Sequence, residues 1–141
     1  MGMRVNRYLA ELEESGMNLL VFSGGKVVYS SDERGIMPLV DAIDVIGGEG
    51  LGDLITADRI VGKAAALLNV YLGAREVHAM LISAGAKGLL LERGIPFEFR
   101  EETDAIKMKD GIIFCPFERM VQDVSDPEEA YSMMKERLAG F

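Results

Sequence analysis

The only cysteine of the chain lies in a segment whose residue types could do covalent chemistry. The segment reads FCPFERMV over residues 114–121 and places Cys115 directly before Pro116. We expect a helix over 116–122 with Pro116 as its first residue, which puts the thiol at the helix N-terminus. A thiol in that position can be activated as a nucleophile, so Cys115 is the candidate catalytic residue. The alternative is a packed, inert cysteine, which is the more common state of a free thiol.

Glu118 is the acidic residue of the same segment. It falls where the acid of a capping box reaches back to the first amides of its own helix. A carboxylate that lies close to the thiol works against thiolate formation. We therefore predict Glu118 as a residue of the candidate site, and the reactivity of Cys115 stays open.

A second group of candidate residues lies in TADRIVGKAAALL, residues 56–68. We expect one buried helix over 57–72, with Asp58 in its first turn, where a negative charge suits the helix dipole. Arg59 and Lys63 would then share a face near the positive end, where a carboxylate or a bound anion would compensate their charges. Gly62 costs a helix about 1 kcal/mol relative to alanine, which indicates a close approach of backbone or ligand. Solvated cations and tight packing of Gly62 on a sheet are the alternative.

Two polar residues belong to the predicted strand over 76–83. Ser83 ends this strand, and ligands of open α/β sheets bind beyond the carboxyl ends of strands. Ser83 is therefore a candidate ligand-binding residue, although an ordinary helix cap is equally compatible. His78 is the only histidine, and a lone strand histidine is more often a satisfied structural group than a base. One cysteine and one histidine fall short of a zinc site, so we expect no metal and no cofactor.

Composition narrows the classes of function. The chain has 141 residues, of which 49% are hydrophobic and 27% charged, and this fits a single domain over 1–141. The formal net charge of -8 argues against binding to nucleic acid or to an anionic membrane surface. With one cysteine and no apolar export signal, we expect a cytoplasmic protein.

The elements that must position these residues follow from hydrophobic periodicity and from glycine and proline. Gly24-Gly25 predicts a tight hairpin between two strands. A strand–helix–strand unit over 76–99 implies a right-handed parallel crossover, and a hairpin beside it makes the sheet mixed. Helices on both faces would give a three-layer α/β/α domain. The predicted strands are 18–23, 26–30, 76–83 and 95–99, and the predicted helices are 3–15, 36–46, 57–72, 86–94, 116–122 and a last one from Pro127.

The segments DRIVGKAAALL, VHAMLIS and CPFERMV, followed by SDPEEA, resemble the DUF1893 family over about residues 17–135. The most specific parts are Asp58 with VGKAAAL, and Cys115-Pro116 with Glu118. The resemblance implies a cytidine deaminase-like fold without an established function. Zinc deaminases open two helices with His-x-Glu and Pro-Cys-x-x-Cys signatures. The corresponding segments here, 61–63 and 83–86, hold no zinc ligand, so hydrolytic zinc deamination is not expected.

Three hypotheses about function remain. The first is a small-molecule-binding protein for a nucleotide or nucleoside, in which Lys63 attracts an anionic group. The second is an enzyme that uses Cys115 as nucleophile with His78 or Lys63 as base. The third is a structural or partner-binding domain, for which pairing of strand edges in a homodimer is plausible. In the first, the pocket walls are formed by Asp58, Gly62, Lys63, Ser83, Cys115 and Glu118.

Overall fold

The computed structural model describes residues 6–48, 50–106 and 115–140. Helices and strands alternate along most of this chain. The helices are α1 (Arg7–Ser15), α2 (Met37–Ile46), α3 (Lys63–Leu72), α4 (Ala84–Glu92), α5 (Pro116–Met120) and α6 (Pro127–Leu138). The strands are β1 (Leu19–Ser23), β2 (Lys26–Ser31), β3 (Leu54–Val61), β4 (Glu76–Ser83) and β5 (Phe97–Thr103).

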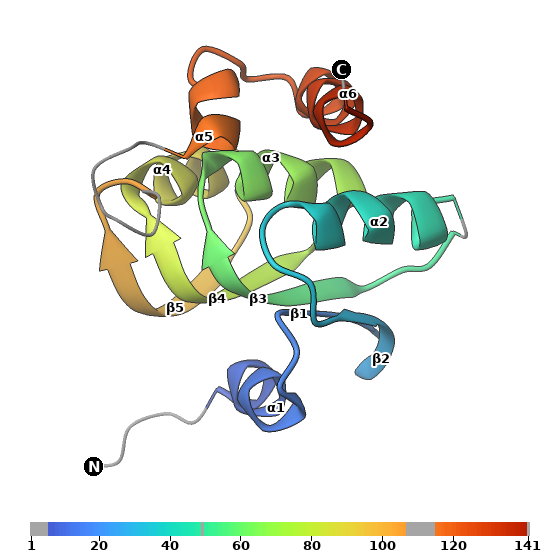
Figure 1. The fold of residues 1–141 in the computed structure, drawn as a ribbon. Helices are drawn as coiled ribbons and strands as arrows, with labels where there is room; N and C mark the ends of the chain where they lie inside the picture. Colours follow the sequence, from blue (N-terminus) through green and yellow to red (C-terminus); the bar gives the residue numbers. More distant parts are fainter. Residues whose placement is uncertain (1–5, 49, 107–114, 141) are drawn as a thin grey trace.

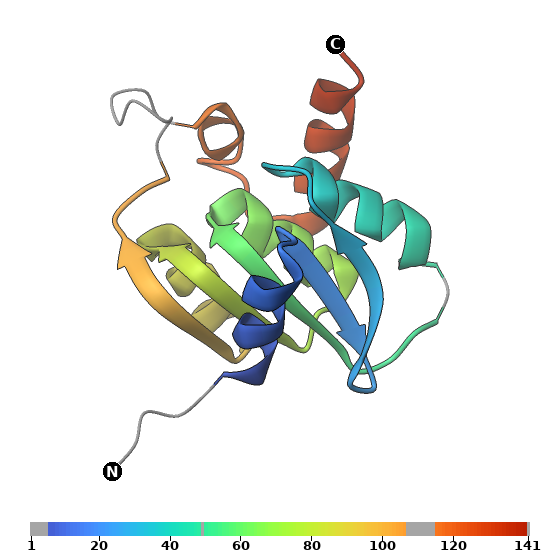
Figure 2. The same cartoon turned by 60° about the horizontal axis from the view of Figure 1, so that its bottom comes forward.

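Within the described residues the strands form one mixed, five-stranded sheet in the order β2-β1-β3-β4-β5. Strand β1 is antiparallel to both β2 and β3, whereas β3, β4 and β5 run parallel. Helix α1 covers one face of the sheet, and α2, α3 and α4 cover the other (Figures 1 and 2). Helix α6 packs on α2 and α3 from outside. The predicted α/β fold with a mixed sheet between helical layers is thus confirmed.

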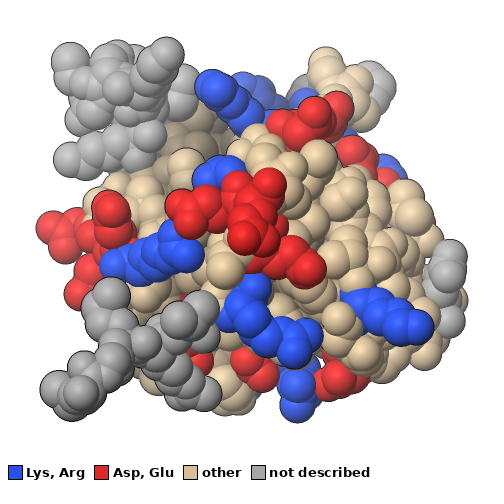
Figure 3. Space-filling model, turned by 90° about the horizontal axis from the view of Figure 1, so that it is seen from below, with Lys and Arg blue, Asp and Glu red and all other residues tan. Residues whose placement is uncertain are grey.

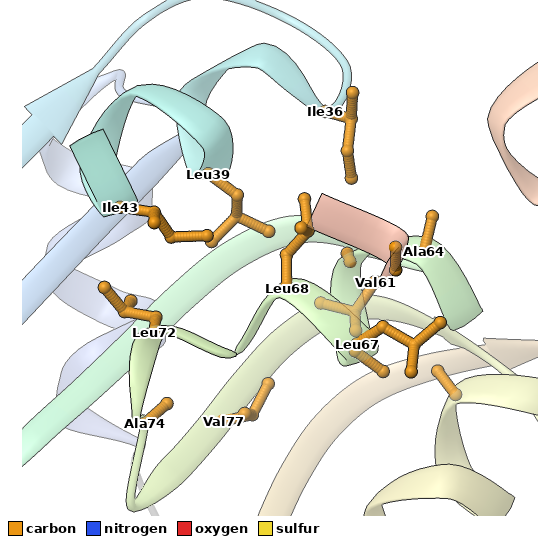
Figure 4. Close-up of a cluster of buried hydrophobic side chains, with 14 of the residues drawn as sticks. Ile36, Leu39, Ile43, Val61, Ala64, Leu67, Leu68, Leu72, Ala74 and Val77 are labelled. Carbon is orange, nitrogen blue, oxygen red and sulfur yellow. The ribbon is translucent and has the colours of Figure 1, made fainter. Parts of the chain in front are cut away.

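The hydrophobic core has two parts because the sheet is covered on both faces. The larger part lies between the sheet and α2, α3 and α6, and Figure 4 shows side chains of α2 and α3 in one cluster with Val61 and Val77 of the sheet. The smaller part lies under α1. Its buried members are Leu9, Leu12, Leu20, Phe22, Ile55 and Ala57. Strand residues serve the two parts alternately, as the period of two requires.

Helix α1 is tied to the sheet by polar contacts as well. Asn6 caps α1 by accepting from Leu9 N (3.0 Å), and its amide nitrogen lies 2.7 Å from His78 Nδ1 of β4. His78 is buried, its Nε2 lies 2.8 Å from Glu76 Oε1, and the Tyr8 ring packs against it. His78 is therefore a satisfied structural group, as predicted. On this side of the molecule, acidic and basic side chains lie next to one another (Figure 3).

The prediction of a single helix over 57–72 is wrong. Residues up to Val61 form the central strand β3, and α3 begins only at Lys63. Strand β3 is covered on both faces, so its residues 54–58 are all buried. The strand reads LITADRIV and does not alternate strictly between apolar and polar residues, so periodicity did not separate its end from the apolar helix that follows. Gly62, in an extended conformation, marks the boundary. Consequently Asp58 is not in a first helical turn, and Arg59 and Lys63 do not share a helix face.

Other boundaries shift less. The hairpin, α2 and β4 lie where they are predicted, and the pairing of β4 with the edge strand β5 is parallel as expected. Strand β5 begins at Phe97 and continues to Thr103, beyond the predicted strand over 95–99. Residues 112–114, for which the sequence allows a short strand or a loop, lie outside the described residues.

Candidate functional site

A cleft of about 500 Å³ lies beyond the carboxyl end of β3. Most of its walls come from the end of β3 with the start of α3, from the segment before α2, and from the start of α5, and Asn18 and Ile106 complete the lining. Most of its lining is apolar, and its polar lining residues include Asn18, Glu33, Arg34, Asp58, Arg59, Cys115 and Glu118. The cleft thus brings four predicted site residues together, namely Asp58, Gly62, Cys115 and Glu118.

Asp58 places a buried carboxyl group on the wall of this cleft. Thr56, two residues earlier, donates to Asn69 of α3 (2.6 Å), so Asp58 faces the same side of the sheet. Its residue is only 8% exposed. Burial raises the pKa of its carboxyl to about 7, although the neighbouring amides of Arg59 and Ile60 act in the opposite direction. Among the described residues, no side-chain donor or cation contributes to this pKa. Asp58 is therefore a buried acceptor that already bonds to the backbone amides of Arg59 and Ile60, and a ligand could supply a further donor.

Glu118 has a different role from the one predicted. Instead of capping α5, its carboxylate accepts hydrogen bonds from Lys63 N and Ala64 N, both at 2.8 Å. It thereby caps the N-terminus of α3, a helix that lies more than fifty residues away in sequence. Gly62 provides the room, because a Cβ there would lie 2.4 Å from Glu118 Oε1. The close approach expected at Gly62 exists, and the approaching group belongs to the chain itself.

Cys115 occupies the N-cap position of α5, as predicted. Its thiol makes no capping hydrogen bond, and the residue is partly exposed at the cleft wall. The backbone amide of Cys115 donates to Ile106 O (3.2 Å), and Ile106 also lines the cleft. Cys115 is thus a partly exposed residue of the cleft wall, and its thiol is not held by a capping bond.

Comparison with known proteins identifies the family of this chain. The model of a domain of unknown function, DUF1893, matches residues 7–138. The chain belongs to the DUF1893 family. Its structure is similar to the crystal structure, at 2.70 Å resolution, of a DUF1893 family protein from Thermotoga maritima, with a TM-score of 0.82 and 29% sequence identity. That likeness covers 95% of this chain and 92% of the other. A comparison with curated proteins found no match.

Two of the predicted binding residues of this DUF1893 chain lie outside the cleft lining. Lys63 donates from Nζ to Gln122 O (3.0 Å), so its ammonium supports the segment after α5. Ser83 caps α4 by accepting from Ala86 N (3.1 Å). The interpretation of Ser83 as an ordinary N-cap therefore describes its observed contact. The predicted roles of Lys63 and Ser83 in ligand binding have no support from the position of the cleft.

Sequence reasoning missed Asn18 and Arg34 in the cleft lining, whereas it had considered Arg59 as a cation beside a bound anion. Asn18 precedes β1 and donates from Nδ2 to Asp32 O (2.8 Å) and Glu33 O (3.2 Å), which fixes the segment that carries Arg34. Arg59, at the end of β3, donates from Nε to Met17 O (3.1 Å). Arg34 lies in a polar connection without a motif, so its sequence gives no signal of this position.

The described part of the DUF1893 structure gives no support to a metal-dependent function or to a membrane-spanning one. Across residues 6–48, 50–106 and 115–140, no group of three or more His, Cys, Asp or Glu side chains is arranged to hold a metal ion. At the start of α3, the segment compared with a deaminase signature holds the Glu118 carboxylate. No helix in the described ranges is both long and apolar enough to cross a lipid bilayer.

Proposed function

We propose that this protein binds a small heteroaromatic molecule of the nucleoside or nucleotide class in the cleft beside Asp58. The observation that carries the proposal is a carboxyl group that is 8% exposed on the wall of a mainly apolar cleft of about 500 Å³. Pockets for small molecules combine an apolar lining with a few convergent polar groups. A carboxylate is acceptor-only, so its partner must present N–H or O–H donors. The amino and imino groups of nucleobases present such donors on a flat apolar ring.

The raised pKa of Asp58 gives this binding a pH dependence. At pH values below about 7 the carboxyl is largely protonated, and above that value it is a carboxylate. A donor-bearing ligand prefers the carboxylate, so its affinity should increase as the pH rises from 6 to 8 and then level off. Below pH 7, binding should release a proton.

The test is calorimetric titration of free nucleobases, nucleosides and nucleotides into wild-type protein and Asp58→Asn. We expect at least one compound to bind wild-type protein, and Asp58→Asn to weaken it about tenfold and to remove the pH dependence. Ser83→Ala serves as the control, because Ser83 caps α4 away from the cleft lining. If no compound binds, or if Asp58→Asn binds as wild type does, the proposal fails. Loss of stability in Asp58→Asn without any ligand would favour the structural-domain hypothesis.

A second candidate function, an enzyme with Cys115 as nucleophile, is favoured by one observation: Cys115 and Asp58 line the same cleft. The bases suggested by the sequence do not fit, since His78 is engaged on the α1 side and Lys63 bonds to Gln122 O. Asp58, with a pKa of about 7, is a better placed proton acceptor. Iodoacetamide labelling of native and unfolded protein tests this. Labelling in the native state, slowed by Asp58→Asn, supports the enzyme; labelling only after unfolding rejects it.

A further inference from the structure

The cleft lining includes two arginine residues that the binding of a neutral ring does not use. Arg34 and Arg59 both line it, although the chain as a whole has a net charge of -8. Among the described residues, the ion pairs formed by arginines involve Arg75 and Arg100, and neither cleft arginine takes part in one. Glu33 also lines the cleft but pairs with neither of them. Two arginines without carboxylate partners at one cleft are a site for an anionic group.

The backbone around both arginines is held in place by the same short segment. Arg59 donates from Nε to Met17 O and from its amide to Asn18 O, both at 3.1 Å. The Asn18 side chain holds the carbonyl groups of Asp32 and Glu33, next to Arg34. The Nε contact leaves the two terminal nitrogens of the Arg59 guanidinium for another acceptor. The backbone that carries both arginines is therefore fixed before any ligand arrives, and the Arg59 side chain is held at Nε, which lowers the entropic cost of binding.

The N-terminus of α3, where an anion was expected beside Lys63, is already occupied by the Glu118 carboxylate. The first amides of α3 are capped by Glu118, and the Lys63 ammonium bonds to Gln122 O. An anionic ligand would have to displace a buried carboxylate to use that helix terminus. The arginines require no such displacement.

We propose that Arg34 and Arg59 bind the phosphate of the ligand while Asp58 binds its ring, so that the substrate class is a nucleoside monophosphate and not a nucleoside. This inference rests on the proposed function and adds the anionic half of the ligand. A phosphate at a site with an exposed arginine is held partly by screened charge, so its contribution should weaken as salt increases.

The experiment compares each nucleoside with its own 5′-monophosphate by calorimetry at pH 8, at low and at moderate salt. We expect at least one monophosphate to bind about tenfold or more tightly than its nucleoside, and this ratio to fall with salt. Arg34→Gln and Arg59→Gln should each reduce the ratio towards one and leave nucleoside affinity unchanged. Arg59→Lys also lacks the Nε bond to Met17 but keeps the positive charge. It therefore shows whether a loss in Arg59→Gln comes from the charge or from the missing bond. Arg137→Gln, on exposed α6, is the matched control.

The outcomes separate the two proposals. If nucleoside and monophosphate bind equally, or if the arginine variants keep the ratio, the phosphate site is wrong while binding at Asp58 stands. If Asp58→Asn weakens both compounds equally and the arginine variants weaken only the monophosphate, both proposals are supported. If neither compound binds, both are overturned.

Discussion

The carboxylate of Glu118 lies in the space that a side chain at position 62 would occupy. A Cβ at Gly62 would lie 2.4 Å from Glu118 Oε1 and 2.6 Å from its carboxyl carbon. From this position the carboxylate accepts from the amides of Lys63 and Ala64. The absence of a side chain at one residue thus allows a residue of α5 to cap α3, and this contact places Cys115 at the cleft.

Gly62→Ala should destabilise the protein by about 1–3 kcal/mol, because the added methyl group displaces the buried Glu118 carboxylate. Backbone strain is not the cause, since Gly62 has φ of -96° and ψ of -175°. The measurement is the free energy of unfolding in urea. Gly88→Ala in α4 is the control: a Cβ there meets nothing within 4 Å, and alanine should stabilise the helix by up to about 1 kcal/mol. Equal effects of the two substitutions would contradict this account.

Glu118→Ala should cost about 2 kcal/mol, because two amides at the start of α3 lose a charged acceptor. Glu118→Gln keeps one acceptor oxygen and should lose less. The double variant Gly62→Ala with Glu118→Ala tests the contact itself. Since the methyl group then meets no carboxylate, its loss in stability should be smaller than the sum of the two single losses. Additive losses would show that the two residues act independently.

Asp58→Asn should change how stability depends on pH. The pKa of Asp58 is about 7 in the folded protein against an ordinary value of 3.8. Between these values the folded state binds more protons than the unfolded state, so the stability of wild-type protein falls as pH rises. Each pKa unit corresponds to about 1.4 kcal/mol, so the full loss is on the order of 4 kcal/mol.

The asparagine variant lacks this ionisation, and its stability relative to wild type should rise from pH 4 to pH 7 and stay constant above. Urea unfolding of both proteins at pH 4.5, 6 and 8 measures the difference. A difference that does not change with pH would show that Asp58 titrates normally in the folded protein.

Asn6→Ala should loosen α1, because Asn6 both caps this helix and contacts His78 of β4. We expect a loss of about 1–2 kcal/mol in the free energy of unfolding. Asn6→Ser keeps a capping oxygen and loses the contact with His78, so its loss should be intermediate. Hydrogen exchange of the α1 amides is the local measurement. If Asn6→Ser is as destabilising as Asn6→Ala, the contact with the sheet outweighs the cap.

Local signals predicted much of this fold. The Gly24-Gly25 turn, the proline at the start of α5 and the buried strand over 76–83 act through neighbouring residues, and all of them lie as expected. The cytidine deaminase-like description stays a prediction. The prediction failed at 57–72 because periodicity did not separate the end of a central strand from the apolar helix that follows. Residues 57–61 form a strand because they pair with β1 and β4. Such pairing depends on distant segments and cannot be read from the segment itself.

The sequence by itself indicated the residue types of the site and their local positions: Cys115 as a helix cap, Ser83 as a helix cap, and Gly62 as a point of close approach. Only the tertiary structure decided which residues meet. Glu118 caps α3 instead of α5, Lys63 bonds to Gln122 O and is not part of the cleft lining, and Arg34 is. The physical reason is that caps and turns depend on a few adjacent residues, whereas a cleft depends on packing between segments that are far apart in the chain.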